Sequence, residues 1–91
     1  MRRIQAVVRG QVQGVSYRYY TRLEATQLSL TGWVRNVPNG TVELVAEGEE
    51  AELQQLVAFL HRGSPAAQVS QVDWEWQEAT NEFTRFEVRW L

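Results

Sequence analysis

The segment GQVQGVSYR, residues 10–18, restricts what this chain can fold into more than any other, because it joins a strand pattern to a helix pattern through a glycine turn. The residues before the turn alternate, and one face of that strand carries Ile4, Ala6, Val8, Gly10 and Val12. Gly14 marks the turn, and Ser16 can serve as the N-cap of a helix expected over about residues 17–28. The segment therefore predicts a strand, a tight turn and a helix start in direct succession.

The same turn is the strongest candidate for a functional site. Backbone N–H groups of a tight turn and of a helix's first turn converge on one concave, partly positive spot. Arg18 adds a planar fork of donors that matches phosphate oxygens. An isolated arginine is most often a solvated surface charge, but a cation at a helix N-terminus opposes the helix dipole, so a bound anion explains Arg18 better. The turn therefore predicts an oxyanion or phosphate cradle.

A hairpin and a second helix follow in the middle of the chain. Residues 32–37 and 42–46 alternate on either side of Pro38-Asn39-Gly40, which is typical of two strands joined by a short turn. Three glutamates then precede apolar residues at helical spacing, namely Leu53, Leu56, Val57 and Leu60. This pattern predicts the strongest helix of the chain.

Two further alternating runs, residues 72–77 and 85–90, complete the pattern as strands with one apolar face. The order of elements predicts an α+β fold, a ferredoxin-like βαββαβ sandwich. In it an antiparallel sheet carries two helices on one face, and a short extra strand is added at the C-terminus. The 91 residues contain no long linker, so we expect one domain covering residues 1–91.

The composition excludes several kinds of function. The chain has no cysteine, and all nine of its basic residues are arginine. Thiolate nucleophiles, cysteine-ligated metals, a GxxxxGK[ST] nucleotide loop and a Schiff-base lysine are therefore excluded. The net charge of −2 provides no basic field for nucleic acid. No apolar run is long enough for a membrane span, and we expect a cytoplasmic protein without nucleic-acid or membrane partners.

The remaining polar candidates have ordinary structural explanations as well as functional ones. Asn36 can simply start the hairpin turn, but the second strand of a βαβ unit runs parallel to the first and ends at the same edge as residues 13–18. There its amide could hold a water against a bound phosphate, and both interpretations stay open. His61 at a helix end favours contact with terminal carbonyls, and nothing in its spacing from Asp73 indicates a catalytic triad. The cluster Glu49-Glu50-Glu52 is typical of a solvated helix start and not of a metal site.

Three motifs together resemble the acylphosphatase family. They are GQVQGVSYR at residues 10–18, LTGWVRN at 30–36 and GTVE at 40–43. The family pattern is a G-x-V-Q-G-V-x-[FY]-R loop, then G-W-V-[RK]-N, then a turn and G-x-V-E, and the match covers nearly the whole chain. Departures are Tyr17 where Phe is commoner, Ser29 where Gly is frequent, and Trp90 where a terminal Tyr is usual. Ser29 bears on stability and not on chemistry, because a non-glycine residue in a left-handed helix cap costs about 1 kcal/mol.

The resemblance implies a ferredoxin-like fold and hydrolysis of the carboxyl-phosphate bond of small acyl phosphates, without metal or organic cofactor. It implies that Arg18 and Asn36 are the catalytic residues. It also implies that the phosphate is bound by backbone N–H groups of Gly14, Val15, Ser16, Tyr17 and Arg18. We expect inorganic phosphate or sulfate to compete for this site and the protein to be a monomer.

Two other functions fit the same element order. A non-catalytic module could use the same cradle to bind phosphate or carbamoyl phosphate, although retention of both Arg18 and Asn36 argues against it. An RNA-recognition domain shares the βαββαβ order, but its aromatic sheet motifs are not apparent and the net charge has the wrong sign.

Overall fold

The structure, a computed structural model, describes residues 1–90. Its elements are β1 (Arg2–Gln11), α1 (Tyr17–Gln27), β2 (Thr31–Asn36), β3 (Val42–Gly48), α2 (Glu50–Leu60), β4 (Gln68–Gln77) and β5 (Phe86–Arg89). The predicted order of strands and helices is confirmed, and the first helix begins at the residue expected for it.

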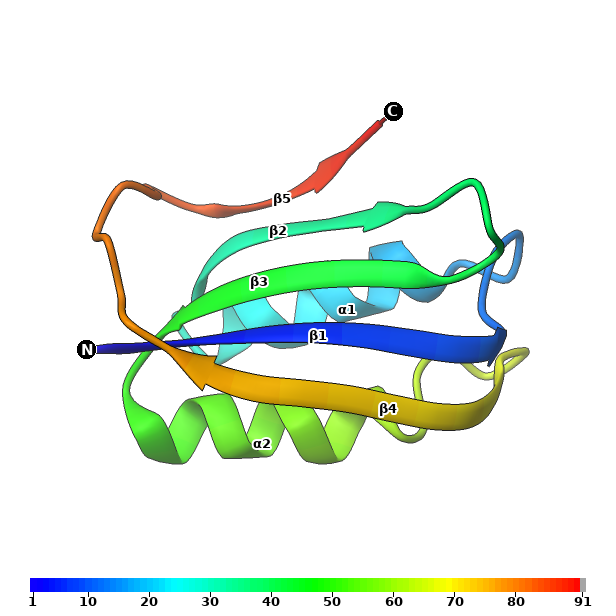
Figure 1. The fold of residues 1–91 in the computed structure, drawn as a ribbon, viewed down its shortest axis with the longest axis horizontal. Coiled ribbons are helices and arrows are strands. Elements are labelled where there is room, and N and C mark those ends of the chain that lie inside the picture. The colour runs from blue at the N-terminus through cyan, green and yellow to red at the C-terminus, as the bar shows by residue number, and fades with distance from the viewer. Residues whose placement is uncertain (91) are drawn as a thin grey trace.

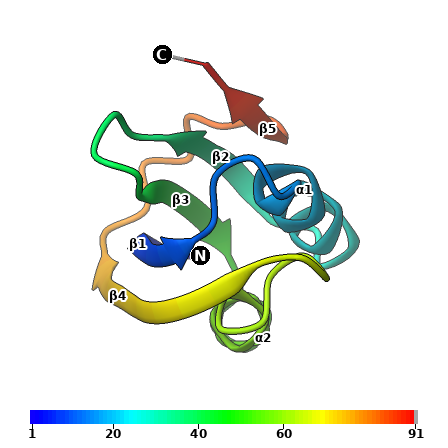
Figure 2. The ribbon, with the colours of Figure 1, turned by 90° about the vertical axis from the view of Figure 1, so that its right-hand side faces the viewer.

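The strands form one sheet in the order β4-β1-β3-β2-β5, with both helices on the same face (Figures 1 and 2). β3 lies between β1 and β2 and is antiparallel to both, and β4 is antiparallel to β1. The predicted antiparallel sheet is thus confirmed for the first four strands. The short C-terminal strand β5 extends this sheet by pairing in parallel with β2. Since β1 and β2 are parallel to each other, both end at the same edge of the molecule.

The core lies between the sheet and the helices, as the alternation predicts. Ile4, Ala6 and Val8 of β1 are fully buried, whereas Arg9 is exposed. α2 contributes fully buried residues at helical spacing, namely Leu53, Leu56 and Leu60. The opposite face of the sheet carries ion pairs, such as that between Arg35 and Glu43 at 2.7 Å. One apolar face per element is therefore enough to define this two-layer arrangement.

Helix α1 ends in a left-handed residue that is not glycine. Ser29 has a φ of 58°. The Leu30 N–H donates to the Ala25 carbonyl at 2.9 Å, and the Ser29 N–H donates to the Thr26 carbonyl at 3.1 Å. This pair of hydrogen bonds is the Schellman arrangement, which usually has glycine at the left-handed position.

We expect Ser29→Gly to raise the free energy of unfolding by about 1 kcal/mol, because glycine removes the steric cost of the left-handed conformation. Ser29 is exposed, so the change removes no core packing. Urea denaturation measures the difference, and Ser29→Ala serves as the control because it keeps the β-carbon. Equal stability of the glycine and alanine variants would contradict this explanation.

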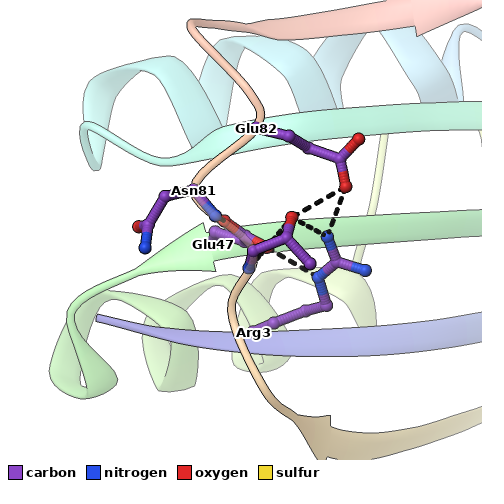
Figure 3. Close-up of polar contacts among 5 residues, drawn as sticks. Arg3, Glu47, Asn81 and Glu82 are labelled. Atoms are coloured by element: carbon purple, nitrogen blue, oxygen red, sulfur yellow. Dashed lines mark hydrogen bonds and ion pairs between the residues drawn. The ribbon is translucent and has the colours of Figure 1, made fainter.

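A buried carboxylate holds the β4–β5 connection against the sheet, at the end of the molecule opposite the connection between β1 and α1 (Figures 1 and 3). Glu47 is fully buried near the end of β3. It accepts hydrogen bonds from the Thr80 N–H at 2.9 Å, the Asn81 N–H at 3.0 Å and Arg3 Nε at 2.7 Å. Arg3 also pairs with Glu82 at 3.3 Å. Glu47 and Arg3 therefore hold the segment that leads the chain into β5.

The surroundings of Glu47 favour its charged form. Burial by itself raises the pKa of a carboxyl group, but the hydrogen bonds from Thr80, Arg3 and Asn81, together with the positive charge of Arg3, outweigh burial. The pKa of Glu47 is lowered as a result. Glu47 is therefore an ionised group that the fold needs in its charged form.

Candidate active site

The connection between β1 and α1 contains two residues with left-handed backbone. Gly14 has a φ of 74° and Ser16 a φ of 63°. Ser16 stands at the N-cap position, and its carbonyl accepts from the Tyr20 N–H at 3.1 Å, but its side chain makes no capping hydrogen bond. Ser16 is thus the N-cap residue, as expected, but its left-handed backbone differs from the extended conformation in which a capping side chain usually binds the first N–H groups.

The absence of a side-chain cap strengthens the case for a cradle. The first N–H groups of a helix have no partner within the helix, and the Ser16 side chain does not satisfy them. A turn with left-handed residues directs successive N–H groups toward one point, where an anion can bind.

One cleft of about 750 Å³ gathers most of the residues predicted for the site. Its lining includes Gly14, Ser16, Tyr17, Arg18 and Asn36. Val15 is not among the lining residues. Its side chain packs against the core, and its carbonyl accepts a hydrogen bond from Ser64 Oγ at 2.5 Å. The cleft thus unites the two side chains expected to be catalytic with the turn between β1 and α1.

Arg18 is oriented by the C-terminal strand. Its Nη1 donates to the Arg89 carbonyl at 3.4 Å, and its guanidinium carbon lies 4.2 Å from the centre of the Trp90 ring. The ion pairs within residues 1–90 involve other arginines, namely Arg2, Arg3, Arg9, Arg35, Arg85 and Arg89. Arg18 is therefore held in place while its charge is not neutralised by the described carboxylates.

Asn36 is the last residue of β2, and it is opposite Val42 of β3. Val8 of β1 is also opposite Val42, which places Asn36 level with Val8, in the last part of β1 before it ends at Gln11. Asn36 Oδ1 is buried and has no hydrogen-bond partner among residues 1–90. A buried acceptor without a partner is costly, and Asn36 belongs to the lining of the cleft, so a donor bound there would relieve this cost.

The hairpin turn does not depend on the Asn36 side-chain oxygen. Asn39 Oδ1 instead accepts from Thr41 N–H at 3.1 Å and Thr41 Oγ1 at 2.7 Å. The Gly40 N–H donates to the Val37 carbonyl at 3.0 Å. Of the two interpretations of Asn36, a turn initiator or a site residue, these contacts favour the second.

Gln13 connects the cradle to this hairpin turn, a role that was not assigned from the sequence. Its Nε2 donates to the Val37 carbonyl at 2.7 Å and to the Thr41 carbonyl at 2.8 Å. Both carbonyls belong to the turn that follows Asn36. Gln13 thus connects the turn between β1 and α1 to the turn that follows Asn36. Its position in the G-x-V-Q-G-V motif is the sequence feature that could have indicated this role.

Tyr17 supports the cradle from the core. Its side chain is buried, and its hydroxyl donates to the Leu60 carbonyl at the end of α2 at 2.7 Å. Burial raises the pKa of Tyr17, so the phenol stays protonated. Gly63, with a φ of 65°, has no space for a β-carbon against the Tyr17 ring. The hydroxyl that distinguishes Tyr17 from the commoner Phe therefore has a partner.

The other polar candidates lie outside the cleft. His61 is exposed just after α2, and none of Glu49, Glu50 and Glu52 lines the cleft. Within residues 1–90 no three side chains of His, Cys, Asp or Glu are grouped as a metal site requires. Neither α1 nor α2 is long and apolar enough to cross a membrane.

Comparison with known proteins identifies the family. Residues 4–88 match the family model described as Acylphosphatase. The acylphosphatase of Acaryochloris marina is 49% identical over 85 residues, covering 93% of this chain and 90% of the relative. That of Methylococcus capsulatus is 48% identical over 88 residues, covering 97% and 96%. The crystal structure of acylphosphatase from Bacillus subtilis superposes with a TM-score of 0.94 at 36% identity, covering 98% of this chain and 99% of that one. The chain therefore belongs to the acylphosphatase family, enzymes that hydrolyse acyl phosphates.

Proposed function

We propose that the cleft between the β1–α1 turn and Asn36 is where this chain hydrolyses the carboxyl-phosphate bond. In this proposal Arg18 and the backbone N–H groups of residues 14–18 hold the phosphoryl group, and Asn36 Oδ1 accepts a hydrogen bond from the attacking water. The observation that carries the proposal is that Asn36, whose amide oxygen is buried and unpartnered, lines the same cleft as Arg18, which has no carboxylate partner among residues 1–90.

The chemistry requires little of the protein beyond positioning and charge. Water attacks phosphorus while the bond from phosphorus to the carboxylate oxygen breaks, and the products are a carboxylate and inorganic phosphate. A carboxylate is already a good leaving group, so no strong general acid is needed. Charge on the phosphoryl oxygens in the loose transition state is stabilised by the guanidinium fork and by fixed N–H groups. The proton of the water passes to the phosphate or to solvent.

The binding partners follow from the same site. The substrate is a small acyl phosphate, and inorganic phosphate or sulfate is proposed to compete with it for the cradle. We further propose that the chain acts as a cytoplasmic monomer and that no metal takes part. Turnover should therefore be indifferent to a chelator and inhibited by inorganic phosphate.

We expect Asn36→Ala to lower kcat for benzoyl phosphate by about 100-fold, because the water loses its acceptor. The inhibition constant of inorganic phosphate should stay close to that of the parent, since Arg18 and the turn are intact. The loss of benzoyl phosphate absorbance, with chelator present, measures both quantities.

Asn39→Ala is the matched control for Asn36→Ala. It removes the hydrogen bonds that stabilise the hairpin turn but leaves the Asn36 amide in place. Parent-like turnover by Asn36→Ala, or an equal loss in Asn39→Ala, would rule out the water-positioning role. A parent protein that binds phosphate but does not turn over benzoyl phosphate would instead favour the non-catalytic module.

A further inference from the structure

The cleft extends well beyond what a phosphoryl group occupies. Its volume of about 750 Å³ falls in the range of pockets that hold whole small molecules. Beyond the cradle, its lining includes Tyr19 and Arg22 of α1, Arg85 of the β4–β5 connection, and Glu87. Beyond the cradle, the cleft therefore has charged side chains beside apolar ones such as Phe86 and Val88.

Arg22 lies one turn after Arg18 on the same helix. Residues four apart share a helix face, and the rise of 1.5 Å per residue separates them by about 6 Å along the axis. Two like charges at this spacing repel each other and destabilise a helix. The guanidinium of Arg22 is 6.0 Å from the centre of the Tyr19 ring, and Arg22 is in none of the ion pairs that residues 1–90 form. Arg22 therefore offers an uncompensated positive charge beside the site.

The charges that line the cleft do not balance. Three arginines, Arg18, Arg22 and Arg85, stand against one carboxylate, Glu87. Glu87 is itself paired with Arg85 at 3.6 Å and with Arg89 at 3.3 Å. One phosphoryl group at the cradle engages Arg18 and leaves Arg22 with no anion.

We propose that the cleft prefers acyl phosphates whose acyl group carries a second negative charge, which Arg22 binds. This inference rests on the proposed function, because it places the phosphoryl group at Arg18. The candidate substrate is the monophosphate of a short dicarboxylic acid, with the phosphoryl group at Arg18 and the free carboxylate at Arg22, one helical turn further along α1. Arg22 is then a specificity-determining residue that takes no part in the attack on phosphorus.

The test compares two substrates of similar size, succinyl phosphate and butyryl phosphate, of which only the first has a free carboxylate. The parent should have the higher kcat/KM for succinyl phosphate. In Arg22→Gln, kcat/KM for succinyl phosphate should fall about tenfold more than that for butyryl phosphate, the effect of one charge-assisted hydrogen bond at an accessible site. Arg22→Lys should keep part of the preference, because the charge remains.

Arg62→Gln is the control for loss of one positive charge, since Arg62 is exposed and does not line the cleft. It should keep the ratio of the two kcat/KM values of the parent. Equal falls for both substrates in Arg22→Gln would mean that Arg22 only attracts phosphate, and they would overturn the proposal. A parent that does not prefer succinyl phosphate would overturn it as well. Hydrolysis of neither substrate by the parent would instead refute the proposed function on which the inference rests.

Discussion

Arg18→Ala is expected to lower kcat/KM for benzoyl phosphate by about 1,000-fold, or about 4 kcal/mol of transition-state stabilisation. Arg18 is the side chain that the C-terminal strand holds over the cleft, through the Arg89 carbonyl and the Trp90 ring. In the proposed mechanism, its charge lies where negative charge develops on the phosphoryl oxygens. The fold should survive the change, because a cation in the first turn of a helix is unfavourable to begin with.

A lysine variant separates the geometry of the Arg18 side chain from its charge, and a variant at Arg62 serves as the control. Arg18→Lys keeps the charge but loses the planar fork of donors, so it should lose nearly as much activity as the alanine variant. Arg62→Ala removes a charge outside the cleft and should keep the kcat/KM of the parent. Circular dichroism verifies that each variant is folded. Substantial activity in Arg18→Lys would show that charge alone is sufficient and that the fork is not needed.

Glu47→Ala is expected to lower the free energy of unfolding by about 3 kcal/mol, because it removes one partner of a buried, hydrogen-bonded charge pair. The change leaves Arg3 Nε and the N–H groups of Thr80 and Asn81 without their acceptor. Urea or thermal denaturation measures the loss. Glu50→Ala removes an exposed ion pair with Arg2 and, as the control, should cost less than about 1 kcal/mol.

The contribution of Glu47 should also depend on pH. Its pKa in the folded protein is lowered from the ordinary value of 4.5. A group of this kind stabilises the fold fully above its unfolded pKa, and the contribution is lost as the pH falls through the folded pKa. The difference in stability between the parent and Glu47→Gln should therefore be largest near neutral pH and shrink below about pH 4.5. Carboxylates of this kind titrate down to roughly pH 3. If the stability difference between the parent and Glu47→Gln stayed constant down to that pH, the ionised form of Glu47 would be excluded as the source of the stability.

Much of this protein could be predicted from local patterns. Alternation over residues 4–12 predicts the strand with Ile4 and Val8 inward, and apolar spacing predicts α2, because burial of one face imposes the period of the element on the sequence. Gly14 indicated the turn after the first strand, and Arg18 indicated a positive charge beside that turn. The parallel direction of β1 and β2 followed from topology, and it brought Asn36 to the same cleft. These features are local, or follow from the order of the elements.

Other features depend on segments far apart in the sequence, and only the tertiary structure decided them. The burial of Glu47 depends on the β4–β5 connection lying over it, and the orientation of Arg18 depends on β5 pairing beside β2. The contact of Gln13 with the hairpin turn likewise joins two segments that are far apart in the sequence. A periodic pattern records which face of an element is buried but not which distant segment covers that face. Long-range contacts arise only when the whole sheet assembles.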